Sequence, residues 1–170
     1  MKCWPRCIKR ANPMTFRVKA PKAGQSVLAI NEVVSENQAA AKDPQGDFDD
    51  YIEIVNTSDN EIDLSGKYLT DSKKNPRKWR FPKGTKIAAG ERLVVWADED
   101  GKAKEGLHAN FKLAKGGETI QLIDSDNAGN SILDEVKFAK LGPDLAYRRL
   151  PDAKGDFSVG AASPGTDNTK

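Results

Sequence analysis

The chain has 170 residues, which is enough for one domain with a hydrophobic core and an additional terminal segment. Its 27 Lys and Arg residues nearly balance its 25 Asp and Glu residues, so the net charge is only +2. The two signs are interspersed along the sequence, and this pattern does not indicate the clustered basic face of a dedicated nucleic-acid-binding protein.

The two cysteines, Cys3 and Cys7, both lie near the start of the chain, and this excludes a disulfide-dense secreted scaffold. Their spacing differs from that of a redox motif, so we expect free or adventitiously paired thiols. No stretch is apolar enough to cross a bilayer, and no apolar segment follows the basic start as in a signal peptide. We expect an extracellular or cell-surface location if the chain is part of a longer exported protein, and a cytoplasmic one otherwise.

Residues 1–25 are expected to form a flexible N-terminal arm or linker, because they are rich in Pro, Lys and Arg and show no hydrophobic period. A short strand could lie at residues 16–18. The domain proper is expected over residues 26–168, and residues 151–170 are rich in Gly, Ser and Asp and resemble a tail.

Short strands separated by turn residues are predicted from residue 27 onward. Gly66 and Gly90 are expected at turns that need a positive φ. A loop of about a dozen residues is expected at 37–48, which is long enough to be a functional candidate. The predicted strands cover residues 27–34, 51–56, 62–64, 68–70, 78–81, 86–87, 92–97, 111–113, 118–123, 132–138 and 146–149.

No window shows the apolar spacing of a helix, so the pattern predicts an all-β sandwich or barrel. Trp79 and Trp96 are the expected anchors of its core, since large aromatic side chains dominate the packing of small domains. The alternation of side chains along a strand places Glu32 and Asp134 on apolar strand faces, where each buried carboxylate would need a partner. A β-bulge would shift the alternation and could place either residue on the opposite face.

The order of the strand and turn segments resembles the lamin-tail domain of bacterial type. Two departures are Lys67, where the family often has an aromatic residue, and Arg148, where a small residue is usual. The resemblance spans roughly residues 27–168 and is carried by INEV at 30–33, DYIEIVN at 50–56, IDLSGKYLTD at 62–71, WRFPKGTKIAAGERLVVWA at 79–97, WADEDG at 96–101, LHANFKL at 107–113, GE at 117–118, YRRLPD at 147–152 and SPG at 163–165.

This resemblance implies an immunoglobulin-like antiparallel β-sandwich and a non-catalytic module. In nuclear lamins the domain engages protein partners, but this chain lacks the heptad rod of a lamin, so filament formation does not carry over. Bacterial members resemble accessory domains of exported proteins. We therefore expect an interaction or structural module that docks a protein or surface partner, or other domains of its own parent chain, with its oligomeric state left open.

The alternative function is binding of a polyanion, either a nucleic acid or an acidic polysaccharide, through a basic hairpin. Its tentative binding residues are Lys73, Lys74, Arg77 and Lys78, which surround Pro76 in the densest basic run of the chain. Loop tips on a rigid sandwich are common binding sites, and clustered cations attract phosphates.

We expect no catalytic residue, cofactor or metal. His108 is the only histidine, and no nucleophile stands at a recognisable spacing from it. The acidic loops leave one alternative open, which is a weak calcium site near Glu32, Asp50 and Asp98, because hard oxygen ligands from several loops can bind this ion. Charge runs are more often simply solvated.

Overall fold

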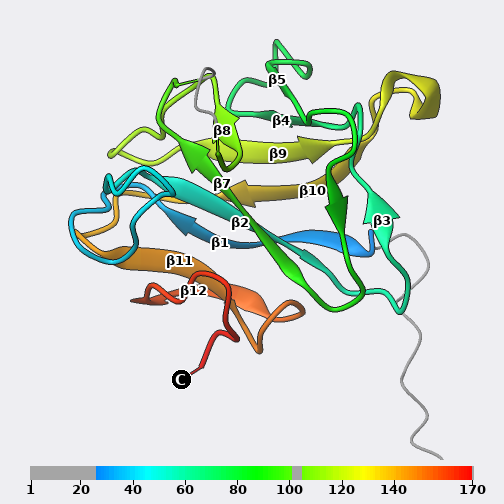
Figure 1. Cartoon of the computed structure of the whole chain (residues 1–170). Coiled ribbons are helices and arrows are strands. Elements are labelled where there is room, and N and C mark those ends of the chain that lie inside the picture. Colours follow the sequence, from blue (N-terminus) through cyan, green and yellow to red (C-terminus); the bar gives the residue numbers. More distant parts are fainter. Residues whose placement is uncertain (1–25, 101–104, 170) are drawn as a thin grey trace, which may run out of the picture.

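Two β-sheets lie face to face in the computed structural model, which describes residues 26–100 and 105–169 (Figure 1). The two cysteines and the expected strand at 16–18 lie outside the described residues. Within these residues the strands are β1 Leu28–Val34, β2 Tyr51–Asn56, β3 Ile62–Asp63, β4 Tyr68–Thr70, β5 Trp79–Arg80, β6 Lys86–Ile87, β7 Arg92–Ala97, β8 His108–Ala109, β9 Thr119–Ile123, β10 Ile132–Lys137, β11 Leu145–Leu150 and β12 Asp156–Ala161.

The larger sheet has the strand order β12-β11-β1-β2-β7-β8, and the smaller one has the order β10-β9-β4-β5. Strands β3 and β6 form a separate two-stranded ribbon. All pairs are antiparallel except β7–β8, which is parallel. The predicted antiparallel sandwich is thereby confirmed.

Most predicted strands occur within one or two residues of their expected bounds, and Gly66 and Gly90 adopt φ angles of 79° and 74°. Residues 111–113, however, form no strand, and only an isolated bridge joins Lys112 to Asp98. The expected polar tail at 151–170 was also wrong, because it contains β12, which pairs with β11 along its whole length. Tertiary pairing stabilises this strand where its own pattern is too weak to indicate it.

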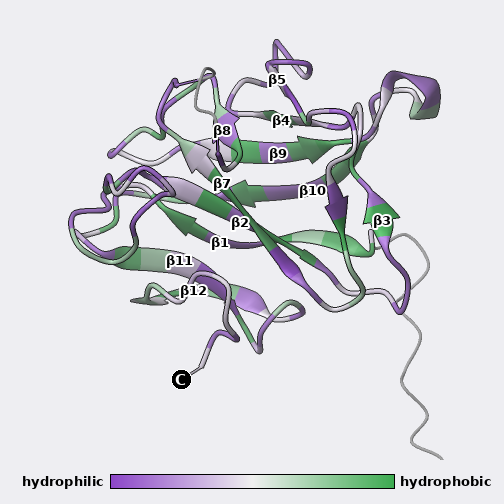
Figure 2. Ribbon diagram, in the orientation of Figure 1, coloured by the Kyte–Doolittle hydropathy of each residue, from purple (hydrophilic) through white to green (hydrophobic). Residues whose placement is uncertain are grey.

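The main core fills the space between the sheets. Figure 2 shows hydrophobic residues concentrated on the strands and hydrophilic ones on the loops. Trp79 lies in this core with its ring centroid 4.8 Å from that of Phe81. Trp96, in contrast, lies in a small cluster with Val34, Tyr51 and Ala146 on the other face of the larger sheet. Strand β7 is thus covered on both faces.

A β-bulge in β1 changes which face each residue occupies. The register between β1 and β2 shifts between Ile30 and Glu32. Ile30 and Val33 both belong to the main core although they are three residues apart. Strict alternation predicts that Glu32 shares a face with Ile30. This prediction is wrong, because the extra residue of the bulge turns both Asn31 and Glu32 to the outer face of the larger sheet.

The backbone of Ile30 at this bulge is hydrogen-bonded by two charged side chains from other strands. Its N–H donates to Asp134 Oδ2 at 2.7 Å, and its carbonyl accepts from Arg149 Nε at 2.8 Å. Arg149 Nη2 in turn lies 2.9 Å from Asp134 Oδ2. The expected partner of Asp134 is thus an arginine, and the pair ties β10 of the smaller sheet to β1 and β11 of the larger one.

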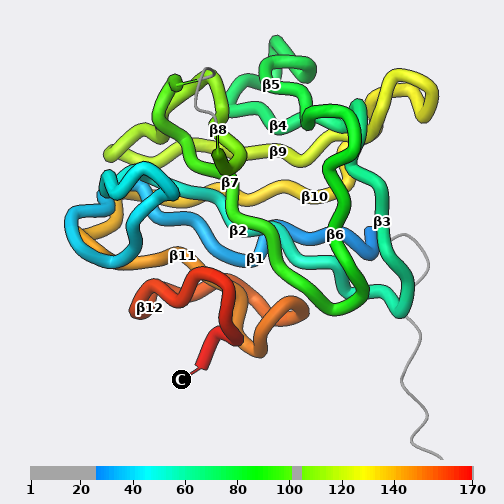
Figure 3. The backbone as a smooth tube through the Cα atoms, viewed as in Figure 1, coloured from blue at the N-terminus to red at the C-terminus, as the bar shows by residue number. Residues whose placement is uncertain are grey.

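The outer face of the larger sheet is covered by residues 162–169, here called the C-terminal strap, which runs beside β11 and β12 (Figure 3). Glu32 is fully buried and accepts bonds from the Tyr51 hydroxyl and from the N–H and hydroxyl of Ser163, the last two at 2.9 Å. Glu53 accepts from Gly165 N–H at 2.6 Å. Two buried carboxylates therefore hold the strap by its backbone.

Glu53 also accepts from Asn31 Nδ2 at 2.8 Å and lies 3.8 Å from Arg92 Nε. Arg92 is shared with two acids of the C-terminal region, Asp152 and Asp167, the latter at 2.5 Å. Burial of the Glu53 carboxyl outweighs these favourable contacts and raises its pKa to about 7.

Removing the carboxylate at the bulge should destabilise the fold. Asp134→Ala leaves the Ile30 N–H and the Arg149 guanidinium without their acceptor, and we expect a loss of about 2–3 kcal/mol in unfolding free energy. Urea denaturation would measure it. The matched control is Glu61→Ala, which breaks an exposed pair with Lys86 and should change the unfolding free energy far less. Equal effects of the two substitutions would contradict the role given to Asp134.

The raised pKa of Glu53 predicts a stability that depends on pH. Between its ordinary value of 4.5 and about 7, the folded state holds a proton that the unfolded state has released. The unfolding free energy should therefore fall as pH rises through this window, by at most about 3 kcal/mol. Glu53→Gln should remove this slope. Urea denaturation of both proteins at about pH 5 and about pH 8 tests the prediction, and parallel pH profiles would contradict it.

Candidate functional site

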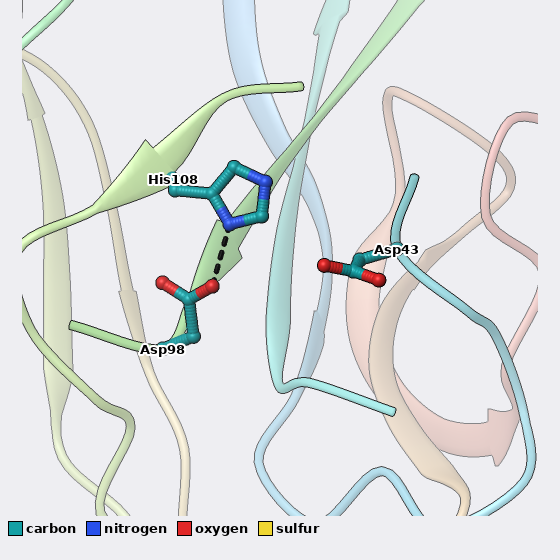
Figure 4. A group of neighbouring side chains, drawn as sticks. All are labelled: Asp43, Asp98 and His108. Carbon is teal, nitrogen blue, oxygen red and sulfur yellow. Dashed lines mark hydrogen bonds and ion pairs between the residues drawn. The ribbon is translucent and has the colours of Figure 1, made fainter. Parts of the chain in front are cut away.

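Three side chains from separate segments meet beside the edge of the larger sheet. Asp98 directly follows β7, His108 begins β8, and Asp43 belongs to the loop between β1 and β2 (Figure 4). One ligand atom from each lies within 4.8 Å of the others. The parallel pairing of β7 with β8 brings Asp98 and His108 together, and the long loop folds back over them.

His108 has a partner on both ring nitrogens. Nδ1 lies 2.5 Å from Asp98 Oδ2, and Nε2 lies 3.0 Å from the carbonyl oxygen of Glu105. The imidazole is almost fully buried, with 3% of its side chain exposed. Burial by itself lowers the pKa of His108, but the hydrogen bond and charge of Asp98 outweigh it, and the pKa is raised. Neither nitrogen faces a nucleophile among these contacts, so the pair is not arranged as a catalytic dyad.

Asp43 is also buried and shapes its own loop. Its Oδ1 accepts from the N–H groups of Gln45 at 2.9 Å and Asp47 at 2.8 Å. Figure 4 shows one of its oxygens directed toward the His108–Asp98 pair. Near this cluster, burial and then the negative charges of Asp98, Asp43 and Asp47 raise the pKa of Asp49. Acceptors and negative charge thus exceed donors and positive charge in this region.

The calcium site considered from the sequence consists of residues that differ from this cluster. Glu32 is engaged by Tyr51 and Ser163 on the outer face, and Asp50 accepts from the N–H of Asn37 at 3.0 Å. Only Asp98 of the three belongs to the cluster. Asp43 was missed because it stands in a loop with no periodic pattern, and only the folded arrangement of that loop places it opposite His108.

The basic hairpin residues are mostly paired with acids in the folded chain. Lys73 lies 3.4 Å from Glu135, Arg77 lies 2.7 Å from Asp126, and Lys78 lies 2.6 Å from Asp71. No ion pair is formed by Lys74 within the described residues. The hairpin therefore presents less unpaired positive charge than its sequence indicates, and polyanion binding there stays a prediction.

A shallow apolar groove of about 280 Å³ lies between the ends of the two sheets, lined by residues 137–141, Tyr147 and Val159. Val159 of β12 is 57% exposed, and Leu145 of β11 is 37% exposed. Lys137 and Lys140 are the charged lining residues. The sequence did not indicate this groove, because β12 was not predicted.

A comparison with known protein families shows to which family the chain belongs. The sequence pattern of the lamin tail domain matches residues 21–140. The chain belongs to this family. The lamin tail domain is a non-enzymatic, immunoglobulin-like interaction module. The resemblance to this family is thereby confirmed, whereas the bacterial type stays a prediction.

The family match ends before β11, β12 and the C-terminal strap, so these elements lie beyond the matched segment. No curated protein matches the chain. Among the described residues, no helix is long and apolar enough to span a membrane.

The ion pairs of the hairpin predict a shallow salt dependence for any polyanion binding there. Each neutralised phosphate contributes about 0.7–0.9 to the slope of log affinity against log salt. Lys74 acting alone should give a slope below about 1 in magnitude, whereas four engaged cations should give about 3. Titration of heparin at several salt concentrations measures the slope. A value near 3 that Lys74→Ser lowers by only about 0.7–0.9 would show that the three ion pairs open on binding.

Proposed function

We propose that this domain is a non-catalytic docking module that binds an extended, acidic and partly apolar segment of a partner protein along β12. The observation that carries the proposal is the pairing of β12, which within the described residues is hydrogen-bonded to β11 only. A six-residue edge strand with one neighbour presents backbone donors and acceptors to an added strand.

The other edges of the two sheets are less suited to such binding. Strands β5 and β8 have only two residues each. Strand β10 is six residues long, but its bulge at Asp134 is bonded to Ile30 and Arg149. Strand β12 is therefore the long edge that has room for another strand.

The chemistry of the adjoining groove indicates the nature of the partner. Val159 and Leu141 offer apolar contacts beside β12, and Lys137 and Lys140 are exposed at its rim without an ion pair among the described residues. No acidic residue lines the groove. A strand that alternates apolar and acidic side chains would bury the former in the groove and place the latter near the lysines.

Polyanion binding through the basic hairpin is the alternative. It lacks a comparable structural support, because three of its four cations are already neutralised by neighbouring acids. The salt dependence described above distinguishes it from docking at β12.

An NMR titration with a synthetic peptide of about ten residues that alternates valine and glutamate tests the docking proposal. We expect shift changes concentrated on residues 156–161 and on Leu141, and none with a peptide that carries lysine in place of glutamate. Val159→Asp should abolish the changes. Ile132→Asp is the matched control, since Ile132 is 55% exposed but lies outside the groove. No binding by the parent protein, or equal binding by the Val159 variant, would overturn the proposal.

A further inference from the structure

We propose that Asp43, Asp98 and His108 form a binding site for a divalent transition-metal ion of the zinc class. The cluster is unrelated to the docking edge, since it lies where the β1–β2 loop meets the start of β8 (Figures 1 and 4). Each of its three residues comes from a different segment, and one potential ligand atom from each falls within 4.8 Å of the others.

The donor set favours this class of ion. One imidazole and two carboxylates are ligands that zinc accepts at about 2.0–2.2 Å, and three protein ligands with a fourth position for water are a common zinc arrangement. Imidazole suits zinc, copper, iron and nickel, whereas calcium prefers oxygen ligands alone. The single histidine therefore selects against calcium as the preferred ion.

The second contact of His108 prepares the imidazole for coordination. Its Nε2 lies 3.0 Å from the Glu105 carbonyl oxygen, which can only accept a hydrogen bond. Nε2 therefore carries a proton, and Nδ1 is the nitrogen that faces the Asp98 carboxylate. Metal-bound histidines typically donate their other N–H to such a carbonyl or carboxylate, which fixes the ring orientation.

The carboxylate of Asp43 has one oxygen that the hydrogen bonds of its own loop leave available to an ion. Asp43 is 7% exposed, and both of its loop hydrogen bonds, from Gln45 and Asp47, go to Oδ1. Within the described residues, Oδ2 accepts no hydrogen bond. Oδ2 is therefore available as a ligand for an ion.

Binding needs only small side-chain movements. Two ligand atoms of a tetrahedral zinc site stand about 3.3 Å apart. Asp98 Oδ2 lies 2.5 Å from Nδ1 and would move away slightly, and an Asp43 oxygen lies within 4.8 Å of both ligand atoms. The ion would then replace the proton shared by His108 and Asp98, and it would tie the β1–β2 loop to the ends of β7 and β8.

The test uses the full chain with Cys3→Ser and Cys7→Ser, so that thiols do not bind the metal, and with any affinity tag removed. Isothermal titration with zinc chloride should show one equivalent bound. Because His108 is the only histidine, its ring nitrogen signals are unambiguous in NMR, and zinc should shift Nδ1 strongly while Nε2 stays protonated.

The decisive variant is Asp43→Asn, which keeps an oxygen to accept the Gln45 and Asp47 N–H groups but removes the charge facing the ion. We expect zinc affinity to fall at least tenfold in this variant and to be lost in His108→Gln, with the fold checked by circular dichroism. Glu105→Gln is the matched control and should bind normally, since that residue contributes only its backbone carbonyl. Absence of zinc binding by the parent, equal affinity in Asp43→Asn, or a preference for calcium would each overturn the proposal.

Discussion

The bulge in β1 is the constraint on which the rest of the structure depends. One extra residue between Ile30 and Glu32 keeps Ile30 and Val33 in the core while it turns Asn31 and Glu32 outward. Asp134 and Arg149 satisfy the Ile30 backbone at this irregularity and connect the two sheets. On the outer face, Glu32 anchors the C-terminal strap. The bulge is thus the point where both layers and the strap are held together.

The strap explains how a six-stranded sheet can bury its outer face with few hydrophobic residues. The small cluster of Val34, Tyr51, Trp96 and Ala146 covers only part of that face. The remainder is polar, and its carboxylates are satisfied by N–H and hydroxyl donors from residues 163–168. Arg148 adds to the covering by lying across Gly160, where a Cβ would stand 2.3 Å from its guanidinium atoms. Gly160 in β12 thus leaves room for the Arg148 guanidinium, so the fold accommodates this departure noted in the sequence.

The sequence predicted the elements whose side chains alternate and whose ends carry turn residues. Strands β2, β4, β6 and β7 have the expected bounds because their apolar positions and flanking turn residues agree. It failed where tertiary contacts decide the outcome. β12 depends on pairing with β11, and β8 consists of two residues paired with the end of β7. The face of Glu32 depends on a bulge that periodicity cannot show. Asp43 reaches His108 only through the path of a long loop, so the cluster could not be predicted from spacing.

Two groups of buried carboxylates in this molecule differ in their balance of donors and acceptors, and this difference separates structure from binding. Glu32 and Glu53 lie opposite each other in the register of β1 and β2, yet each receives several N–H or O–H donors, and Arg92 adds a positive charge beside Glu53. Their environment is complete without a ligand. Asp43 and Asp98 instead face one imidazole whose second nitrogen is already bound to the Glu105 carbonyl oxygen. The first group needs no further hydrogen-bond donor, whereas the second group sets two carboxylates against a single imidazole. A divalent cation carries more charge than the proton shared by His108 and Asp98 and would balance the two carboxylates, and the β1–β2 loop would supply it with a ligand from Asp43.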